Sequence, residues 1–133
     1  MSKRILIIED DVSTSQFLSY TMEYEGFQTL TAGDGLEGLR KAQTENPDLI
    51  ILDIMLPGLD GFELCHRLRT YAPTADIPVL ILSAKAQDAD KAAGFKMGAN
   101  YYVVKPAAPE KIVAAVNDIL NKKLRRENCS EVR

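Results

Sequence analysis

Five short apolar runs, each of strand length, recur along this chain of 133 residues and limit the folds open to it. The runs at 5–8, 49–52 and 79–82 contain only Ile, Leu and Val. Such continuous runs are typical of central parallel strands that are covered on both faces. The run at 27–31 is mixed with polar residues and indicates an edge strand, and the fifth run lies at 101–104.

A segment long enough for one helix follows each of these runs. Alternating strands and helices call for a parallel sheet with right-handed crossovers and helices on both faces. We therefore expect an α/β protein of flavodoxin-like type, with a doubly wound, five-stranded parallel sheet in the order 2-1-3-4-5 and five flanking helices. The helices are expected at about 12–25, 34–45, 61–72, 87–97 and 108–122.

Turn-forming residues mark several of the expected helix ends. The candidate starts are Asp34-Gly35 and Asp60-Gly61, and the candidate stops are Gly26 and Gly98. No linker, internal repeat or low-complexity tract divides the chain. We expect one folded domain over residues 1–122 and a charged C-terminal tail over residues 123–133.

Charge and composition exclude several classes of protein. Sixteen Lys and Arg residues against nineteen Asp and Glu residues give a net charge of −3, so we expect no direct nucleic-acid binding by this chain. No apolar run approaches the roughly 18 residues of a membrane span, and no signal-peptide core is present, so we expect a cytoplasmic protein that does not bind membranes. Cys65, Cys129 and His66 lack the spacing of a disulfide framework or a zinc site.

Polar side chains stand directly after the strands, at the edge of the sheet where open α/β folds bind ligands. Glu9 and Asp10 follow the first run, and Asp53 follows the third. In the expected order these two strands are neighbours, so the three carboxylates converge and repel one another unless a cation neutralises them. Oxygen ligands without His or thiolate favour a hard cation, and we expect Mg²⁺.

Two further groups complete the expected site. Ser83 follows the fourth run and Lys105 follows the fifth. An acidic cluster, a lysine and a hydroxyl around a metal position form a suitable cradle for a phosphoryl group. Asp53 is the central carboxylate and therefore the natural nucleophile, giving an acyl phosphate. Any one of these residues alone is more simply a helix or turn cap, but their convergence indicates phosphoryl chemistry.

Four segments, in this order and at these spacings, resemble the receiver domain of bacterial two-component response regulators. The resemblance covers about residues 3–122. The segments are ILIIEDD at 5–11, LDIMLPGLDG at 52–61, SA at 83–84 and GANYYVVKP at 98–106.

The resemblance implies that Asp53 accepts a phosphoryl group from a phosphohistidine on a sensor histidine kinase or a phosphotransfer protein. The implied Mg²⁺ ligands are Asp10, Asp53 and the backbone carbonyl of Met55, with Glu9 acting through water. Lys105 is implied to pair with Asp53 and then with the phosphate, and the Lys105-Pro106 bond is implied to be cis. Such a chain is not an enzyme in the usual sense, because it catalyses only its own phosphorylation and dephosphorylation.

The resemblance also implies a switch formed by Ser83 and Tyr102. A phosphoryl group on Asp53 attracts the Ser83 hydroxyl and draws in the loop after the fourth strand, which opens space for the Tyr102 ring. The fourth helix, fifth strand and fifth helix then control a downstream protein or an output domain. The candidate readout residues are Lys91, Phe95, Tyr101, Ile112 and Lys122.

The chain departs from the family pattern at two places. Asn100 and Tyr101 stand where DNA-binding members often carry two acidic residues for dimer salt bridges, so we expect a monomer or a weak dimer. Ala107 stands where an aromatic residue usually follows the Lys-Pro pair, which leaves the groove before the last helix more open. We expect a stand-alone receiver or one taken from a longer protein.

Two other classes use the same edge of such a sheet. A phosphatase of haloacid dehalogenase type also has an Asp nucleophile, Mg²⁺, a hydroxyl and a lysine. It needs a second acid two residues after the nucleophile, where this chain has Met55, and more chain for a substrate cap. A flavodoxin-like module for FMN or a nucleotide needs a phosphate loop after the first strand, where Glu9, Asp10 and Asp11 would repel the phosphate.

Overall fold

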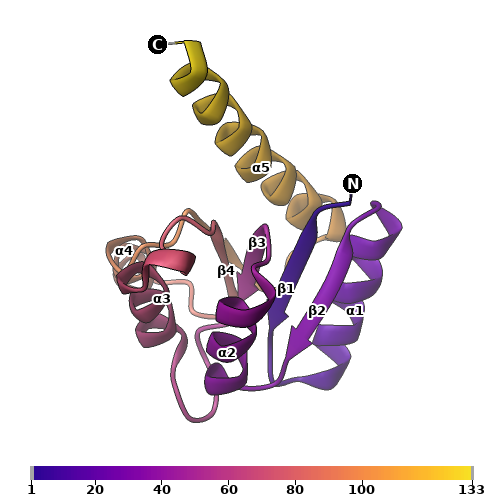
Figure 1. Cartoon of the computed structure of the whole chain (residues 1–133). Helices are drawn as coiled ribbons and strands as arrows, with labels where there is room; N and C mark the ends of the chain where they lie inside the picture. The colour runs from indigo at the N-terminus through magenta and orange to yellow at the C-terminus, as the bar shows by residue number, and fades with distance from the viewer. Residues whose placement is uncertain (1, 133) are drawn as a thin grey trace.

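The computed structural model describes the backbone of residues 2–132 and the side chains of residues 2–122. Strands and helices alternate along the chain (Figure 1). The strands are β1 (Arg4–Ile8), β2 (Gln28–Ala32), β3 (Leu49–Leu52), β4 (Val79–Ser83) and β5 (Tyr101–Val104). The helices are α1 (Val12–Tyr24), α2 (Gly35–Glu45), α3 (Gly61–Thr70), α4 (Asp88–Lys96) and α5 (Pro109–Val132), with a 3-10 helix, η1, at Ala72–Thr74.

The five strands form one parallel sheet in the order β2-β1-β3-β4-β5, which confirms the expected fold. The pairing of Ile8 with Leu52 brings the carboxyl ends of β1 and β3 level with each other. Ser83 pairs with Val104, so β4 and β5 also end together. The residues that follow these four strands therefore meet at one edge of the sheet.

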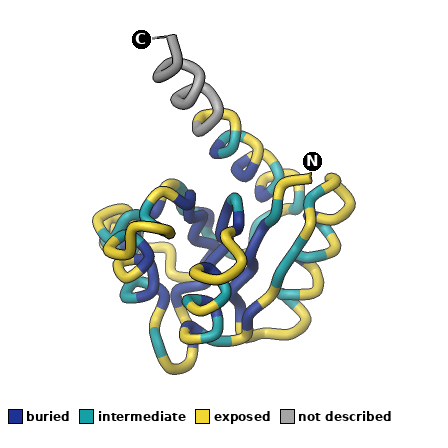
Figure 2. The backbone as a smooth tube through the Cα atoms, viewed as in Figure 1, coloured by how far each residue is buried: buried dark blue, intermediate teal, exposed yellow. Residues whose placement is uncertain are grey.

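Two hydrophobic cores lie on opposite faces of the sheet, because successive strand residues point to opposite sides. Leu6 and Ile8 belong to the core beneath α2, α3 and α4, whereas Ile5 and Ile7 belong to the core beneath α1 and α5. The central strands β1, β3 and β4 are buried along nearly all of their length, whereas the edge strands β2 and β5 are only partly buried and the outer helix faces are exposed (Figure 2). This two-sided burial is the physical reason for the continuous apolar runs.

Aspartates begin three of the helices. The side chains of Asp11, Asp34 and Asp60 accept hydrogen bonds from the backbone N–H groups three residues ahead. Gly26 and Gly98 follow the ends of α1 and α4 with φ angles of +93° and +113°, a conformation that favours glycine. The helix starts and stops expected from the sequence are confirmed.

Several boundaries differ from the sequence-based expectation, most of them by one residue. The Phe27 N–H donates to the Met22 carbonyl at 3.1 Å and closes the end of α1, so β2 begins one residue later, at Gln28. α3 ends at Thr70 because Tyr71 is extended, and η1 follows it. α5 continues to Val132 instead of ending near residue 122.

The length of α5 follows from its composition, since no Gly or Pro interrupts the sequence after Pro109. Its side chains from residue 123 onward, including the predicted tail, lie outside those described. Within residues 2–132, no helix has both the length and the apolar character needed to cross a membrane.

Gly61, the first residue of α3, packs tightly against the segment that carries Asp53. A Cβ atom at position 61 would lie 2.5 Å from the Ile54 Cα and 2.8 Å from the Asp53 carbonyl oxygen. We expect Gly61→Ala to lower the free energy of unfolding by about 1–3 kcal/mol, because backbone has to move. Chemical denaturation measures this loss. Gly33→Ala is the control, since a Cβ at position 33 meets no atom within 4 Å. Equal stabilities of the two variants would contradict the prediction.

Candidate functional site

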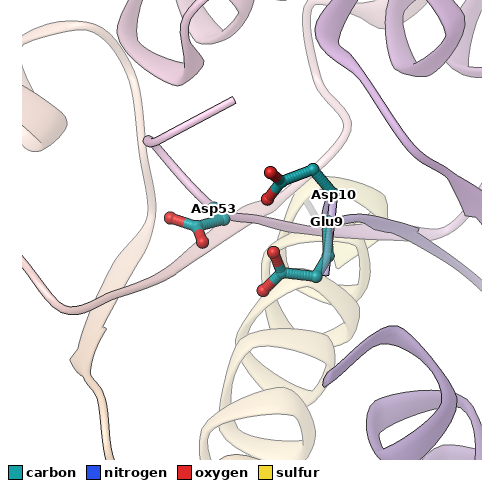
Figure 3. A group of neighbouring side chains, drawn as sticks. All are labelled: Glu9, Asp10 and Asp53. Carbon is teal, nitrogen blue, oxygen red and sulfur yellow. The ribbon is translucent and has the colours of Figure 1, made fainter. Parts of the chain in front are cut away.

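Three carboxylates gather at the carboxyl ends of β1 and β3 (Figure 3). Glu9 and Asp10 follow β1 and Asp53 follows β3. The Glu9 N–H donates to the Ala32 carbonyl at 3.0 Å, and the Asp53 N–H donates to the Ile8 carbonyl at 3.1 Å, so both residues prolong the sheet. One carboxylate oxygen from each of the three acids lies within 4.8 Å of the other two. The convergence expected from the strand order is therefore present.

Lys105 connects two of these acids. Its Nζ lies 2.5 Å from Glu9 Oε1 and 3.0 Å from Asp53 Oδ2. Lys105 follows β5, and its N–H donates to the Ser83 carbonyl at 2.8 Å, so the backbone holds it at the same edge. The Lys105-Pro106 peptide bond is cis, as expected.

Burial and charge act in opposite directions on these groups. Burial raises the pKa of Glu9, against the hydrogen bond from Lys105, which favours the carboxylate. Burial lowers the pKa of Lys105, but hydrogen bonds to Glu9 and Asp53 outweigh it, so the pKa is raised overall. Lys105 is thus held in its charged form.

The donor set fits a hard divalent cation. In their charged forms the three carboxylates and one ammonium group carry a net charge of −2, which a divalent cation neutralises. All the donor atoms are oxygens, the ligands that Mg²⁺ prefers. Glu9 and Asp53 are only 5% and 8% exposed, whereas Asp10 is exposed and leaves room for water ligands. The Met55 N–H donates to Asp53 Oδ1 at 3.1 Å and fixes the loop after Asp53.

Ser83 and Tyr102 are linked through the loop that follows β4. Ser83 is fully buried, and its Oγ accepts a hydrogen bond from the Lys85 N–H at 3.3 Å. The Tyr102 hydroxyl donates to the Lys85 carbonyl at 2.7 Å. Burial and the negative charge of Asp90 raise the pKa of Tyr102, so its hydroxyl stays protonated as a donor. The structure thus ties both residues to the same loop.

The Tyr102 ring lies against α4. A Cβ atom at Gly94 would be 3.1 Å from the Tyr102 Cδ2 atom, and the ring centroids of Phe95 and Tyr102 are 6.5 Å apart. A movement of this ring therefore changes the surroundings of α4 directly.

Asn100 has a role that the sequence did not indicate. Its Oδ1 accepts hydrogen bonds from the Val79 N–H and from Arg69 Nη2, both at 2.9 Å. Arg69 also donates to the carbonyl oxygens of Gly98, Ala75 and Ile77. Asn100 is therefore part of an internal network that anchors the end of α4. No local pattern signals this contact, because its partners are distant in sequence.

Comparison with known proteins supports the resemblance to response regulator receiver domains. The family model "Response regulator receiver domain" matches residues 5–117. Alkaline phosphatase synthesis transcriptional regulatory protein PhoP of Bacillus subtilis is 44% identical over 122 residues, covering 92% of this chain and 50% of that protein. DNA-binding dual master transcriptional regulator RpaA of Synechocystis is 46% identical over 119 residues, covering 90% of this chain and 49% of that protein. The chain spans about half the length of these curated relatives.

Solved structures show the same fold. The receiver domain of a Francisella response regulator matches with a TM-score of 0.86 and 34% identity, over 92% of this chain and 99% of that chain. Chemotaxis protein CheY4 of Vibrio cholerae matches with a TM-score of 0.84 and 31% identity, over 89% of this chain and 98% of that chain. The sheet order, the acidic pocket and the family match over residues 5–117 together show that this chain belongs to the family of response regulator receiver domains.

Proposed function

We propose that this chain is a phosphorylation-dependent switch in which Asp53 accepts a phosphoryl group from a phosphohistidine on a sensor histidine kinase or a phosphotransfer protein. Receiver domains are signalling modules that partner histidine kinases and bind Mg²⁺ at an acidic pocket. The observation that carries the proposal is the place of Asp53, beside Glu9 and Asp10 and 3.0 Å from the Lys105 ammonium group.

In the proposed step, an Asp53 carboxylate oxygen attacks phosphorus. The new oxygen–phosphorus bond forms as the phosphorus–nitrogen bond to the donor imidazole breaks, and the imidazole keeps the electron pair and binds one proton from the solvent. Lys105 stabilises the negative charge on the transferred oxygens, because its hydrogen bond to Asp53 already places it at the reacting carboxylate. No net oxidation occurs, and the proton is the only further species that the step consumes.

The residues that would hold Mg²⁺ are Asp10, Asp53 and the backbone carbonyl of Met55, with Glu9 acting through water. When bound there, Mg²⁺ supplies neutralising charge for the attacking carboxylate and the phosphoryl oxygens. The Lys105 Nζ lies 2.5 Å from one carboxylate oxygen of Glu9, and the Asp11 N–H donates a hydrogen bond to the other oxygen at 3.2 Å. These bonds orient Glu9 and support its indirect role.

The proposed switch passes from Asp53 to α4 through the loop after β4. A phosphoryl group attracts the Ser83 hydroxyl, whose bond to the Lys85 N–H then weakens. The Lys85 carbonyl also accepts the hydrogen bond from the Tyr102 hydroxyl. A shift of Lys85 therefore moves the Tyr102 ring, which lies against Gly94. One new charge thereby alters the face formed by α4, β5 and α5.

We expect phosphorylation to perturb backbone amide NMR signals of residues 84–105 more than those of α2. Tyr102→Phe should reduce this response, because it removes the donor to the Lys85 carbonyl and keeps the ring. Tyr101→Phe is the matched control, since it removes a neighbouring hydroxyl from the same strand. Equal shifts in α2 and residues 84–105, or equal losses in the two variants, would count against the coupling.

The relatives named above are transcriptional regulators of about twice this length. Their names support a proposed role for the α4-β5-α5 face in controlling an output domain or a downstream protein. The net charge of −3 gives no support to direct nucleic-acid binding by the chain itself.

A haloacid dehalogenase-type phosphatase is the alternative function, and one position disfavours it. The second acid of such an enzyme would stand two residues after Asp53, where Met55 has a 58% exposed, uncharged side chain. No group there can protonate a leaving alcohol. The match of residues 5–117 to the receiver family is the stronger guide.

The lifetime of the acyl phosphate depends on water that approaches phosphorus opposite the Asp53 oxygen. We expect this approach to pass Met55 and Lys85, neither of which orients a water molecule for attack. Self-dephosphorylation should therefore be slow. The double variant Met55→Asn, Lys85→Glu should shorten the lifetime, followed as loss of phosphoprotein by intact mass.

Lys96→Glu is the control for this measurement, because it reverses a charge at the other end of α4 from the loop after β4. A lifetime unchanged or lengthened in the double variant would rule out this account of the slow hydrolysis.

A further inference from the structure

A groove of about 690 Å³ lies between α1 and the first half of α5. Phe17, Tyr20 and Tyr24 line it from α1, and Val113 lines it from α5. Tyr20 and Tyr24 are 74% and 82% exposed, and Phe17 is 44% exposed. Single exposed aromatic residues are ordinary, but three along one groove are typical of a surface that binds another chain.

Both charged residues that line this groove are acidic. Glu25 at the end of α1 and Glu110 in the first turn of α5 line it, and no Lys or Arg is among its lining residues. An apolar floor with an acidic rim fits a segment that combines an apolar side chain with basic ones. The partner's chemistry is thereby limited to a basic, amphipathic segment.

The chain itself carries such a segment. Residues 122–126 read Lys-Lys-Leu-Arg-Arg, so four basic residues surround one leucine. The Lys122 side chain is 61% exposed and pairs only with Asp118, at 3.2 Å, among the described residues. Such an exposed pair contributes little and does not prevent Lys122 from binding elsewhere.

This segment cannot reach the groove of its own chain. The first residues of α5 form one wall of the groove. The helix is 24 residues long in all, and its remaining part leads away from the sheet (Figure 1). Such a helix is about 36 Å long, so its distal half stays far from its own first turn. The occupant has to come from a second molecule.

We infer that two copies of this chain associate through the groove between α1 and α5, each receiving the basic segment 122–126 of the other. A two-fold axis near the middle of α5 sets the two helices antiparallel and places residues 122–126 of one copy beside residues 109–113 of the other. The arrangement is self-complementary, because the same two surfaces meet twice.

The proposed dimer does not depend on the phosphorylation site. The groove is separate from Asp53, and neither Asn100 nor Tyr101 lines it. Asn100 is instead bonded to Arg69 and Val79 within the molecule. Asp53→Asn should therefore leave the association unchanged, which separates this inference from the proposed function.

Sedimentation equilibrium of the full chain over a wide concentration range tests the inference. The wild-type chain should show a monomer–dimer equilibrium. Glu25→Lys with Glu110→Lys should raise its dissociation constant about tenfold or more, and so should Arg125→Glu with Arg126→Glu. The combined charge swap should restore dimerisation in the same molecule. Tyr24→Ala should weaken the dimer, whereas Tyr71→Ala, which removes an exposed tyrosine after α3, should not.

A monomer at every concentration would overturn the inference and leave the groove to a different protein. A dimer that is insensitive to both charge reversals would also overturn it, because another surface would then hold the copies together. If the combined charge swap does not restore the dimerisation that each separate reversal weakens, the basic segment 122–126 does not contact the acidic rim of the groove, and the inference is wrong.

Discussion

Asp53→Asn is expected to abolish phosphoryl incorporation from acetyl phosphate in the presence of Mg²⁺. The amide has no negative charge, so it is a poor nucleophile toward phosphorus and a poor ligand for a hard cation. The wild-type chain should gain the mass of one phosphoryl group, and a chelator should prevent the gain. Intact-protein mass spectrometry measures both results.

Asp11→Asn is the matched control for this experiment. Asp11 is exposed, stands next to the acidic pair and caps α1 through its bond to the Thr14 N–H, a role that asparagine also fills. This variant should be labelled like the wild-type chain. Labelling of Asp53→Asn at the wild-type level would remove Asp53 from its proposed role, and thermal unfolding of both variants would establish that they are folded.

The second large effect is expected at Asp10. Asp10→Ala should weaken Mg²⁺ binding by about 10–100-fold or more, because loss of even an outer-shell group reduces metal affinity by that amount. Isothermal titration calorimetry with MgCl₂ measures the affinity. The effect should appear without any phosphodonor, so it tests the metal site independently of the transfer.

Asp11→Ala should reduce Mg²⁺ affinity much less, since the Asp11 side chain accepts hydrogen bonds from Thr14 at the start of α1. The opposite order of effects would show that the acidic pair is Asp10 and Asp11. Asp11→Ala should instead destabilise α1 through loss of this cap.

The central strands of the sheet were predictable because they are buried on both faces. Runs such as Leu49–Leu52 are apolar at every position, and this pattern alone separates central strands from helices that show one apolar face. The site followed from the topology. Once β1 and β3 are neighbours, the residues after Ile8 and Leu52 must meet, whatever their side-chain conformations.

Apart from the pairing of Lys105 with Asp53, which the resemblance implied, contacts between distant side chains were not predictable. The bond from Lys105 to Glu9 joins residues 96 positions apart, and the bond from Tyr102 to Lys85 depends on the course of a loop. The network of Arg69 and Asn100 has no local signature either, because a single asparagine before a strand is compatible with many turns. The end of α5 was also missed, since a polar composition permits a helix as readily as a tail.

A direct chemical test of Asp53 is available, because the proposed product is an acyl phosphate. Borohydride reduces an acyl phosphate to an alcohol and so converts a phosphorylated aspartate to homoserine, which marks the residue permanently. After treatment with acetyl phosphate and Mg²⁺, followed by borohydride and peptide mass spectrometry, we expect homoserine at position 53 and at no other acidic residue. Conversion of Glu9 or Asp10 instead of Asp53, or no conversion of any residue in the phosphorylated protein, would contradict this expectation.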